Sequence, residues 1–139
     1  RNGKTWEDLV LRLPLGRVEP VIGRERPTFL THWPAEQAAL ARRDPEDGRA
    51  ALRFELYLGG LELANAFEEL TDPVEQRERF ATDRKRRMEL SPDQDWAVDE
   101  AFLAALPDLP PCSGIALGFD RLVMLATGAP RISDILWLG

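Results

Sequence analysis

Two glutamates flank a glycine pair in residues 52–67, LRFELYLGGLELANAF. Alternating apolar residues on both sides of the glycines predict a β-hairpin with a two-residue turn. In that hairpin Glu55 and Glu62 are diagonal neighbours on one face, with Cβ atoms roughly 7–8 Å apart. Two carboxylates so close repel each other unless a cation or a proton lies between them, and Mg²⁺ suits such a pair. The alternative is a solvated face on which Arg53 pairs with a glutamate.

The apolar residues of the hairpin share the opposite face, which we expect to be the core. They are Phe54, Leu56, Leu58, Leu61 and Leu63. In a straight strand Asn65 and Glu69 would also fall on that face, where burial without partners is costly. We therefore predict a bulge or strand end near residues 64–66 that turns Asn65, Phe67 and Glu69 toward the carboxylates. That set suits a cationic ammonium ligand; alternatively, Phe67 is core while Asn65 and Glu69 cap the next helix.

The stretch GIALGFDRLVML, residues 114–125, alternates small and large side chains. The small residues are Gly114, Ala116 and Gly118, and the large ones are Ile115, Leu117 and Phe119. We expect the large residues to anchor one face, and the small ones to form a bare face opposite the two glutamates that admits a flat ligand. Arg121, in a helix that begins at about Asp120, could then stack on a ring or bind a phosphate. The alternative is an ordinary core strand with Arg121 paired to an acid.

Both strands and helices are predicted along the chain. Strands are expected at residues 28–32 and in the hairpin, and helices at residues 5–13, 35–43 and 96–106. A further helix should begin at Pro73, with Asp72 as its N-cap and Glu75 completing a capping box. Because the clearest strand pair is antiparallel, the pattern favours an α+β fold.

Composition excludes several classes of protein. The 139 residues suit a single domain, and 44% are hydrophobic. The net charge of −6 argues against a domain that binds nucleic acid through a basic surface. One cysteine and one histidine cannot form a disulfide or a zinc site. Without a secretory signal or an apolar run long enough to cross a membrane, we expect a cytoplasmic protein with no membrane partner.

Two of these stretches resemble a known family. GIALGFDRLVML resembles motif 3 of the class II aminoacyl-tRNA synthetases, and RFELYLGGLELANAFEELTDPVEQRERF resembles the preceding segment of the lysyl-tRNA synthetase branch. The finer similarity is to the short paralogues that attach lysine or β-lysine to elongation factor P. It covers about residues 5–138. It implies that residues 1–139 form the C-terminal part of a class II catalytic core, with an antiparallel sheet flanked by helices.

The resemblance also implies roles for individual residues. Those expected to bind ATP are Glu55, Glu62, Leu63, Gly118 and Arg121, with Glu55 and Glu62 acting through Mg²⁺. Arg121 and Glu62 are the expected catalytic residues. Those expected to bind lysine are Asn65, Phe67, Glu69 and Ala116, with Glu69 near the ε-ammonium. The chain departs from the family at Ala66, where glycine is usual, and in the absence of motifs 1 and 2.

The implied reaction activates lysine or β-lysine as an adenylate and transfers it to a lysine side chain of elongation factor P. One alternative is part of a true lysyl-tRNA synthetase that charges tRNA. Another is a non-catalytic, synthetase-like binding module. Since motif 1 builds the dimer interface and motif 2 contacts the α-phosphate in this family, we expect a homodimeric parent enzyme and little activity from this segment alone.

Overall fold

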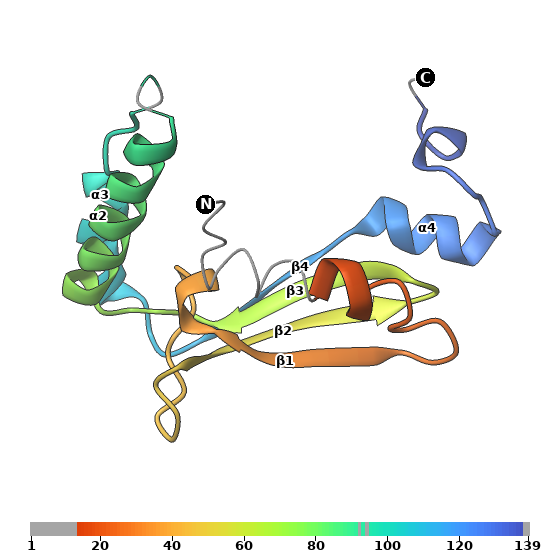
Figure 1. Ribbon diagram of the computed structural model, residues 1–139, viewed down its shortest axis with the longest axis horizontal. Coiled ribbons are helices and arrows are strands. Elements are labelled where there is room, and N and C mark those ends of the chain that lie inside the picture. The colour runs from red at the N-terminus through yellow and green to blue at the C-terminus, as the bar shows by residue number, and fades with distance from the viewer. Residues whose placement is uncertain (1–13, 92, 94, 138–139) are drawn as a thin grey trace, which may run out of the picture. The chain divides into compact units, whose positions relative to one another are not determined.

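A computed structural model describes residues 14–137, apart from residues 92 and 94 (Figure 1). The helix predicted at residues 5–13 lies outside these residues. The strands are β1 (Thr28–Pro34), β2 (Ala50–Leu58), β3 (Leu61–Glu68) and β4 (Ser113–Leu117). The α-helices are α2 (Pro73–Leu90), α3 (Glu100–Ala105) and α4 (Phe119–Thr127). Short helical turns lie at Pro14–Val18, Ala35–Gln37, Leu106–Asp108 and Ile132–Asp134.

The four strands form one antiparallel sheet in the order β1-β2-β3-β4, so each strand lies beside its neighbour in sequence (Figure 1). This confirms the predicted α+β class. The hairpin turn is also confirmed: Gly59 and Gly60 have φ angles of 62° and 79°. Both values lie in the left-handed region that a two-residue type I′ turn requires.

Contacts between residues group the chain into two compact units. Unit 1 comprises the chain up to Leu30, Phe54–Asn65 and the chain from Ile115 onward. Unit 2 comprises Thr31–Arg53 and Ala66–Gly114. Individual strands contribute residues to both units.

The core of unit 2 contains Ala38, Ala41 and Ala51, with Phe67 packed against them. The helix predicted at residues 35–43 is wrong beyond its first turn. Instead, Ala41 forms an antiparallel bridge with Glu69, and Arg43 forms one with Ala51. The backbone of this segment pairs with strand residues distant in sequence, and such pairing competes with the local hydrogen bonds of a helix.

Helix α2 begins as predicted. The Asp72 side chain accepts hydrogen bonds from the backbone N–H groups of Val74 and Glu75, and Pro73 occupies the first turn. The reciprocal half of the capping box is absent, because the Glu75 carboxylate instead accepts from Arg79. Helix α3 begins later than the predicted residue 96, because its N-cap is Asp99 and its first helical residue is Glu100.

In unit 1 the carboxylate-bearing face of the hairpin is the more buried one, contrary to expectation. Glu55 and Tyr57 are 5% and 3% exposed. Of the residues expected to form the core, Leu63 is buried, while Phe54, Leu56, Leu58 and Leu61 are half-buried. The cause is the segment before β1: the Gly23 backbone packs against Tyr57, and its carbonyl accepts a hydrogen bond from the N–H of Gly59.

The large residues around β4 do not anchor a buried face. Ile115, Leu117 and Phe119 are 65%, 51% and 68% exposed. Helix α4 likewise has no buried residue. Strand β4 is the last strand of the sheet among the described residues, so no further strand covers its outer edge.

The predicted strand end near residues 64–66 is wrong. Strand β3 continues through this stretch, and two hydrogen bonds join the β3 segment to the β4 segment. The N–H of Gly118 donates to the Leu63 carbonyl at 2.8 Å, and the N–H of Glu69 donates to the Cys112 carbonyl at 2.9 Å. The same number of residues separates the two bonded positions on each side, so β3 gains no net residue relative to β4.

This register pairs Asn65 with Ala116. The same register places Gly118 opposite Leu63. Among the described residues, no helix is long and apolar enough to cross a membrane.

Candidate functional site

Unit 1 gathers acidic side chains around one tyrosine. The Tyr57 hydroxyl donates a hydrogen bond of 2.6 Å to the Glu55 carboxylate. The Glu19 carboxylate lies 3.5 Å from the same hydroxyl oxygen. Glu62 lies across the hairpin from Tyr57, and its negative charge also raises the pKa of the Tyr57 hydroxyl. We call Glu19, Glu55, Tyr57, Glu62 and Arg121 the hairpin cluster.

Burial and the acidic residues of the hairpin cluster change the pKa of Tyr57. Burial raises the pKa of this phenol well above its ordinary value, and the hydrogen bond to Glu55 raises it further. The negative charges of Glu55, Glu19 and Glu62 act in the same direction. Tyr57 therefore remains a neutral donor that holds the buried Glu55 carboxylate in place, and the surrounding field attracts cations.

Arg121 connects the start of α4 to the hairpin. Its Nη1 donates to the backbone carbonyl of Glu62 at 2.7 Å and lies 3.5 Å from that residue's carboxylate. A Cβ on Gly118 would lie 3.4 Å from the Arg121 Cδ and 3.5 Å from the Leu63 carbonyl oxygen. Together with Glu55, these residues complete the predicted ATP-binding set, so the fold brings all five of its members into one part of unit 1.

The donor set fits a hard cation such as Mg²⁺. Glu55 and Glu62 supply carboxylate oxygens, which are the ligands that Mg²⁺ prefers, and a two-carboxylate site leaves positions open for water and phosphate. Within residues 14–137 without 92 and 94, no three His, Cys, Asp or Glu side chains form a metal-binding group. A cation at this site would therefore need ligands beyond the protein side chains described here.

The carboxylate of Glu69 occupies a defined position in unit 2. A Cβ on Gly114 would lie only 2.3 Å from Oε1 of Glu69. The Glu69 carboxylate thus fills the space that a side chain at residue 114 would take. Its backbone is fixed by the bond to Cys112 and by the bridge to Ala41.

The remaining residues predicted to bind lysine had two possible roles, either contact with a ligand or a structural role in the core and at the start of the next helix. Phe67 packs against the alanine core of unit 2, which supports its alternative role as a core residue. The capping alternative for Asn65 and Glu69 is wrong, because Asp72 caps α2. Asn65 and Ala116 lie opposite each other on β3 and β4, as the register above requires.

Sequence reasoning missed two residues that organise these groups. Tyr57 was given no role, although strand alternation puts it on the same face as Glu55 and Glu62. Arg79 was not considered, although its spacing of four residues from Glu75 predicts a helical ion pair. Both pairings are observed, at 2.6 Å for Tyr57 with Glu55 and 2.6 Å for Arg79 with Glu75.

Comparison with known proteins gives consistent matches. A sequence model of the family described as tRNA synthetases class II (D, K and N) matches residues 17–138. The chain is 54% identical over 132 residues to the elongation factor P–(R)-β-lysine ligase of Proteus mirabilis, covering 94% of this chain and 40% of that protein. It is 49% identical over 136 residues to the Hamiltonella defensa protein of the same name, covering 97% and 42%. It is 56% identical over 121 residues to a Klebsiella pneumoniae protein of that name, and the match covers 86% of this chain and 37% of that protein. The chain thus spans about two fifths of the length of these relatives.

Proposed function

Because this chain belongs to the class II tRNA synthetase family, we propose that it is part of a ligase acting on elongation factor P. That ligase activates lysine or (R)-β-lysine with ATP and transfers it to a lysine side chain of the factor. The observation that carries the proposal is the assembly of the five predicted ATP-binding residues in unit 1. The names of the similar proteins supply the substrates.

In the first step, a carboxylate oxygen of the amino acid attacks the α-phosphorus of ATP. The new P–O bond gives an aminoacyl-adenylate, and the bond to the β-phosphate breaks to release pyrophosphate. Arg121 supports this step by placing a guanidinium beside Glu62, where it can bind a phosphate oxygen or stack on adenine. Catalysis here rests on positioning and charge neutralisation.

Glu55 and Glu62 would hold Mg²⁺, which neutralises phosphate charge when bound. Tyr57 keeps the Glu55 carboxylate oriented through its short hydrogen bond. Leu63 and Gly118 provide a surface for the nucleotide: their backbones are hydrogen-bonded to each other, and Gly118 has no side chain to obstruct it.

In the second step, the ε-amine of the acceptor lysine attacks the acyl carbon of the adenylate. An amide bond forms, AMP leaves, and the amine gives up a proton. Before this step, Glu69 would pair with the ammonium of the bound amino acid. We assign Asn65, Phe67 and Ala116 to contacts with the rest of that amino acid.

We also propose that the protein is cytoplasmic and homodimeric. A single cysteine agrees with a reducing compartment. The exposed apolar residues at β4 and α4 agree with further burial in an assembly. Light scattering on the full-length gene product would contradict the dimer if it gave the mass of one chain.

The reaction is tested with the full-length gene product, ATP and either lysine isomer. We expect pyrophosphate exchange into ATP that depends on the amino acid, followed by an increase in the mass of purified elongation factor P. Lysine-specific tRNA serves as the comparison acceptor, and we expect no amino acid to be attached to it. Charging of tRNA would instead identify a lysyl-tRNA synthetase, and binding of lysine without exchange would identify a non-catalytic module.

A further inference from the structure

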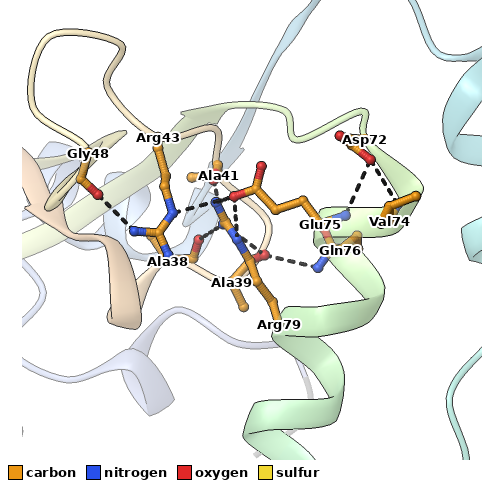
Figure 2. Close-up of polar contacts among 10 residues, drawn as sticks. All are labelled: Ala38, Ala39, Ala41, Arg43, Gly48, Asp72, Val74, Glu75, Gln76 and Arg79. Atoms are coloured by element: carbon orange, nitrogen blue, oxygen red, sulfur yellow. Dashed lines mark hydrogen bonds and ion pairs between the residues drawn. The ribbon is translucent and has the colours of Figure 1, made fainter.

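Arg79 in unit 2 is largely covered, and its guanidinium holds a neighbouring segment (Figure 2). Its side chain is 10% exposed. Nη1 donates to the backbone carbonyls of Ala38, Ala39 and Ala41 at 3.0, 3.3 and 2.7 Å. Nη2 and Nε both donate to Oε1 of Glu75, at 2.6 and 3.2 Å. One side chain on α2 therefore fixes the whole turn at residues 38–41.

Neighbouring contacts strengthen this attachment (Figure 2). The fully buried Gln76 donates from Nε2 to the Ala39 carbonyl at 3.0 Å. Arg43 lies 3.4 Å from the Glu75 carboxylate and donates to the Gly48 carbonyl at 2.8 Å. The charge of Arg79 is thus compensated by Glu75, which also lies beside a second arginine.

The segment held by Arg79 in turn holds the end of β3. The N–H of Leu70 donates to the Leu40 carbonyl at 2.9 Å, and the N–H of Arg42 donates to the Glu68 carbonyl at 2.8 Å. Between these two bonds, Ala41 bridges Glu69. The backbone of Glu69 is therefore fixed on one side by the segment that Arg79 supports.

We propose that Arg79 is a positioning residue for Glu69, and that through it α2 sets how well the amino acid is bound. The inference rests on the proposed role of Glu69 toward the substrate ammonium. The backbone of Glu69 has little freedom to adjust, because its N–H is bonded to Cys112 and the residue bridges Ala41. A shift in the Arg79-supported segment consequently moves the carboxylate itself.

A lysine cannot replace this arginine. The guanidinium is planar and directs several N–H groups at fixed angles, so it contacts the three carbonyls and the carboxylate at once. The compact ammonium of lysine keeps the charge but cannot match this geometry. Arg79→Lys therefore tests positioning while leaving charge and approximate size in place.

The experiment compares Arg79→Lys with Arg77→Lys in the full-length gene product. Arg77 lies on the same helix, where it pairs with Glu100 on the surface. For Arg79→Lys we expect the KM for the lysine substrate in pyrophosphate exchange to rise roughly 10-fold or more. The KM for ATP should change less than about twofold, and Arg77→Lys should leave both values near wild type. A general loss of folded enzyme would instead lower kcat without separating the two KM values.

Hydrogen exchange of a peptide covering residues 66–72 supplies a second measurement. The Leu70 amide should exchange faster in Arg79→Lys than in Arg77→Lys, because its acceptor at Leu40 is less firmly held. If Arg79→Lys does not fold, Glu75→Gln weakens the ion pair that orients the Arg79 guanidinium. It should raise the KM for the lysine substrate and speed the exchange of the Leu70 amide.

The outcomes separate the two proposals. Wild-type exchange that depends on lysine, with an unchanged lysine KM or unchanged Leu70 exchange in the folded variant, overturns the positioning role of Arg79 alone. A wild-type protein that shows no lysine-dependent exchange overturns the proposed function, and the positioning role fails with it.

Discussion

The absence of a side chain at residue 114 determines where the Glu69 carboxylate can lie. A methyl group there would come within 2.3 Å of Oε1, a contact that requires the carboxylate to move. The end of a glutamate side chain can rotate away at little cost in folding free energy. We therefore expect Gly114→Ala to fold normally but to raise the KM for the lysine substrate roughly 10-fold or more.

Gly48→Ala is the matched control, since a Cβ there meets nothing within 4 Å. Both variants are compared with wild type by pyrophosphate exchange and by thermal unfolding. An unchanged lysine KM in folded Gly114→Ala would show that the Glu69 carboxylate does not contact the substrate.

Tyr57 gives a prediction about pH. Its pKa is raised from the ordinary value of about 10 by burial and by the carboxylates around it. Below that pH the phenol is neutral in the folded and unfolded states alike. Above it the unfolded chain can release the proton while the folded chain retains it, so stability falls as the pH rises.

The measurement is the absorbance of tyrosinate during an alkaline titration, taken as the difference between wild type and Tyr57→Phe. Tyr57 is the single tyrosine of this chain, and the difference isolates it in the full-length gene product. The signal should appear only together with unfolding. Titration near pH 10 in a protein that is still folded would contradict the buried hydrogen bond to Glu55.

At the scale of elements, helix α2 depends on its first turn. Asp72 satisfies two backbone N–H groups that would otherwise lack a partner in the helix. Asp72→Ala should lower the free energy of unfolding by about 1 kcal/mol. Urea unfolding measures this, with Asp108→Ala as the exposed control, and equal stabilities of the two variants would contradict the cap.

Elements whose cause is local could be predicted from the sequence. The hairpin follows from two adjacent glycines, and the start of α2 follows from Asp72 and Pro73. The helix predicted at residues 35–43 failed because Ala41 pairs with a strand residue far along the chain. No local pattern contains that partner, so helical spacing alone was misleading.

The faces of the sheet were harder to predict than its strands. Apolar alternation favours burial of Leu56 and Leu58, yet Tyr57 is the more buried because the segment around Gly23 covers it. The strand end was inferred from the cost of burying Asn65, but β3 continues past Asn65, which is only half-buried. The five residues that the family resemblance assigns to ATP lie together in unit 1, whereas the contacts of Tyr57 and Arg79 depend on residues distant in the sequence.

At the scale of the whole molecule, the described chain leaves much apolar surface uncovered. Ile115, Leu117 and Phe119 are more than half exposed, and Trp137 is fully exposed. Exposed apolar groups of this kind promote association. We expect residues 1–139 produced alone to self-associate in size-exclusion chromatography and to bind a hydrophobic dye.

Replacing Ile115 and Leu117 by threonine should reduce that association, since threonine is smaller and polar and has the β-branched shape that strands favour. The full-length gene product is the control and should bind less dye. A monomeric, dye-negative 1–139 chain would contradict this expectation.

The proposed activity of the whole molecule depends on two carboxylates of the hairpin cluster, Glu55 and Glu62, which would bind ATP through Mg²⁺. The most direct test is amino-acid-dependent pyrophosphate exchange by Glu62→Gln, with Glu78→Gln on the exposed face of α2 as the control. We expect exchange to fall by about 10²–10³-fold in Glu62→Gln, because a neutral amide cannot replace the charged ligand, and to be unchanged in the control. Wild-type exchange in folded Glu62→Gln would contradict the central claim.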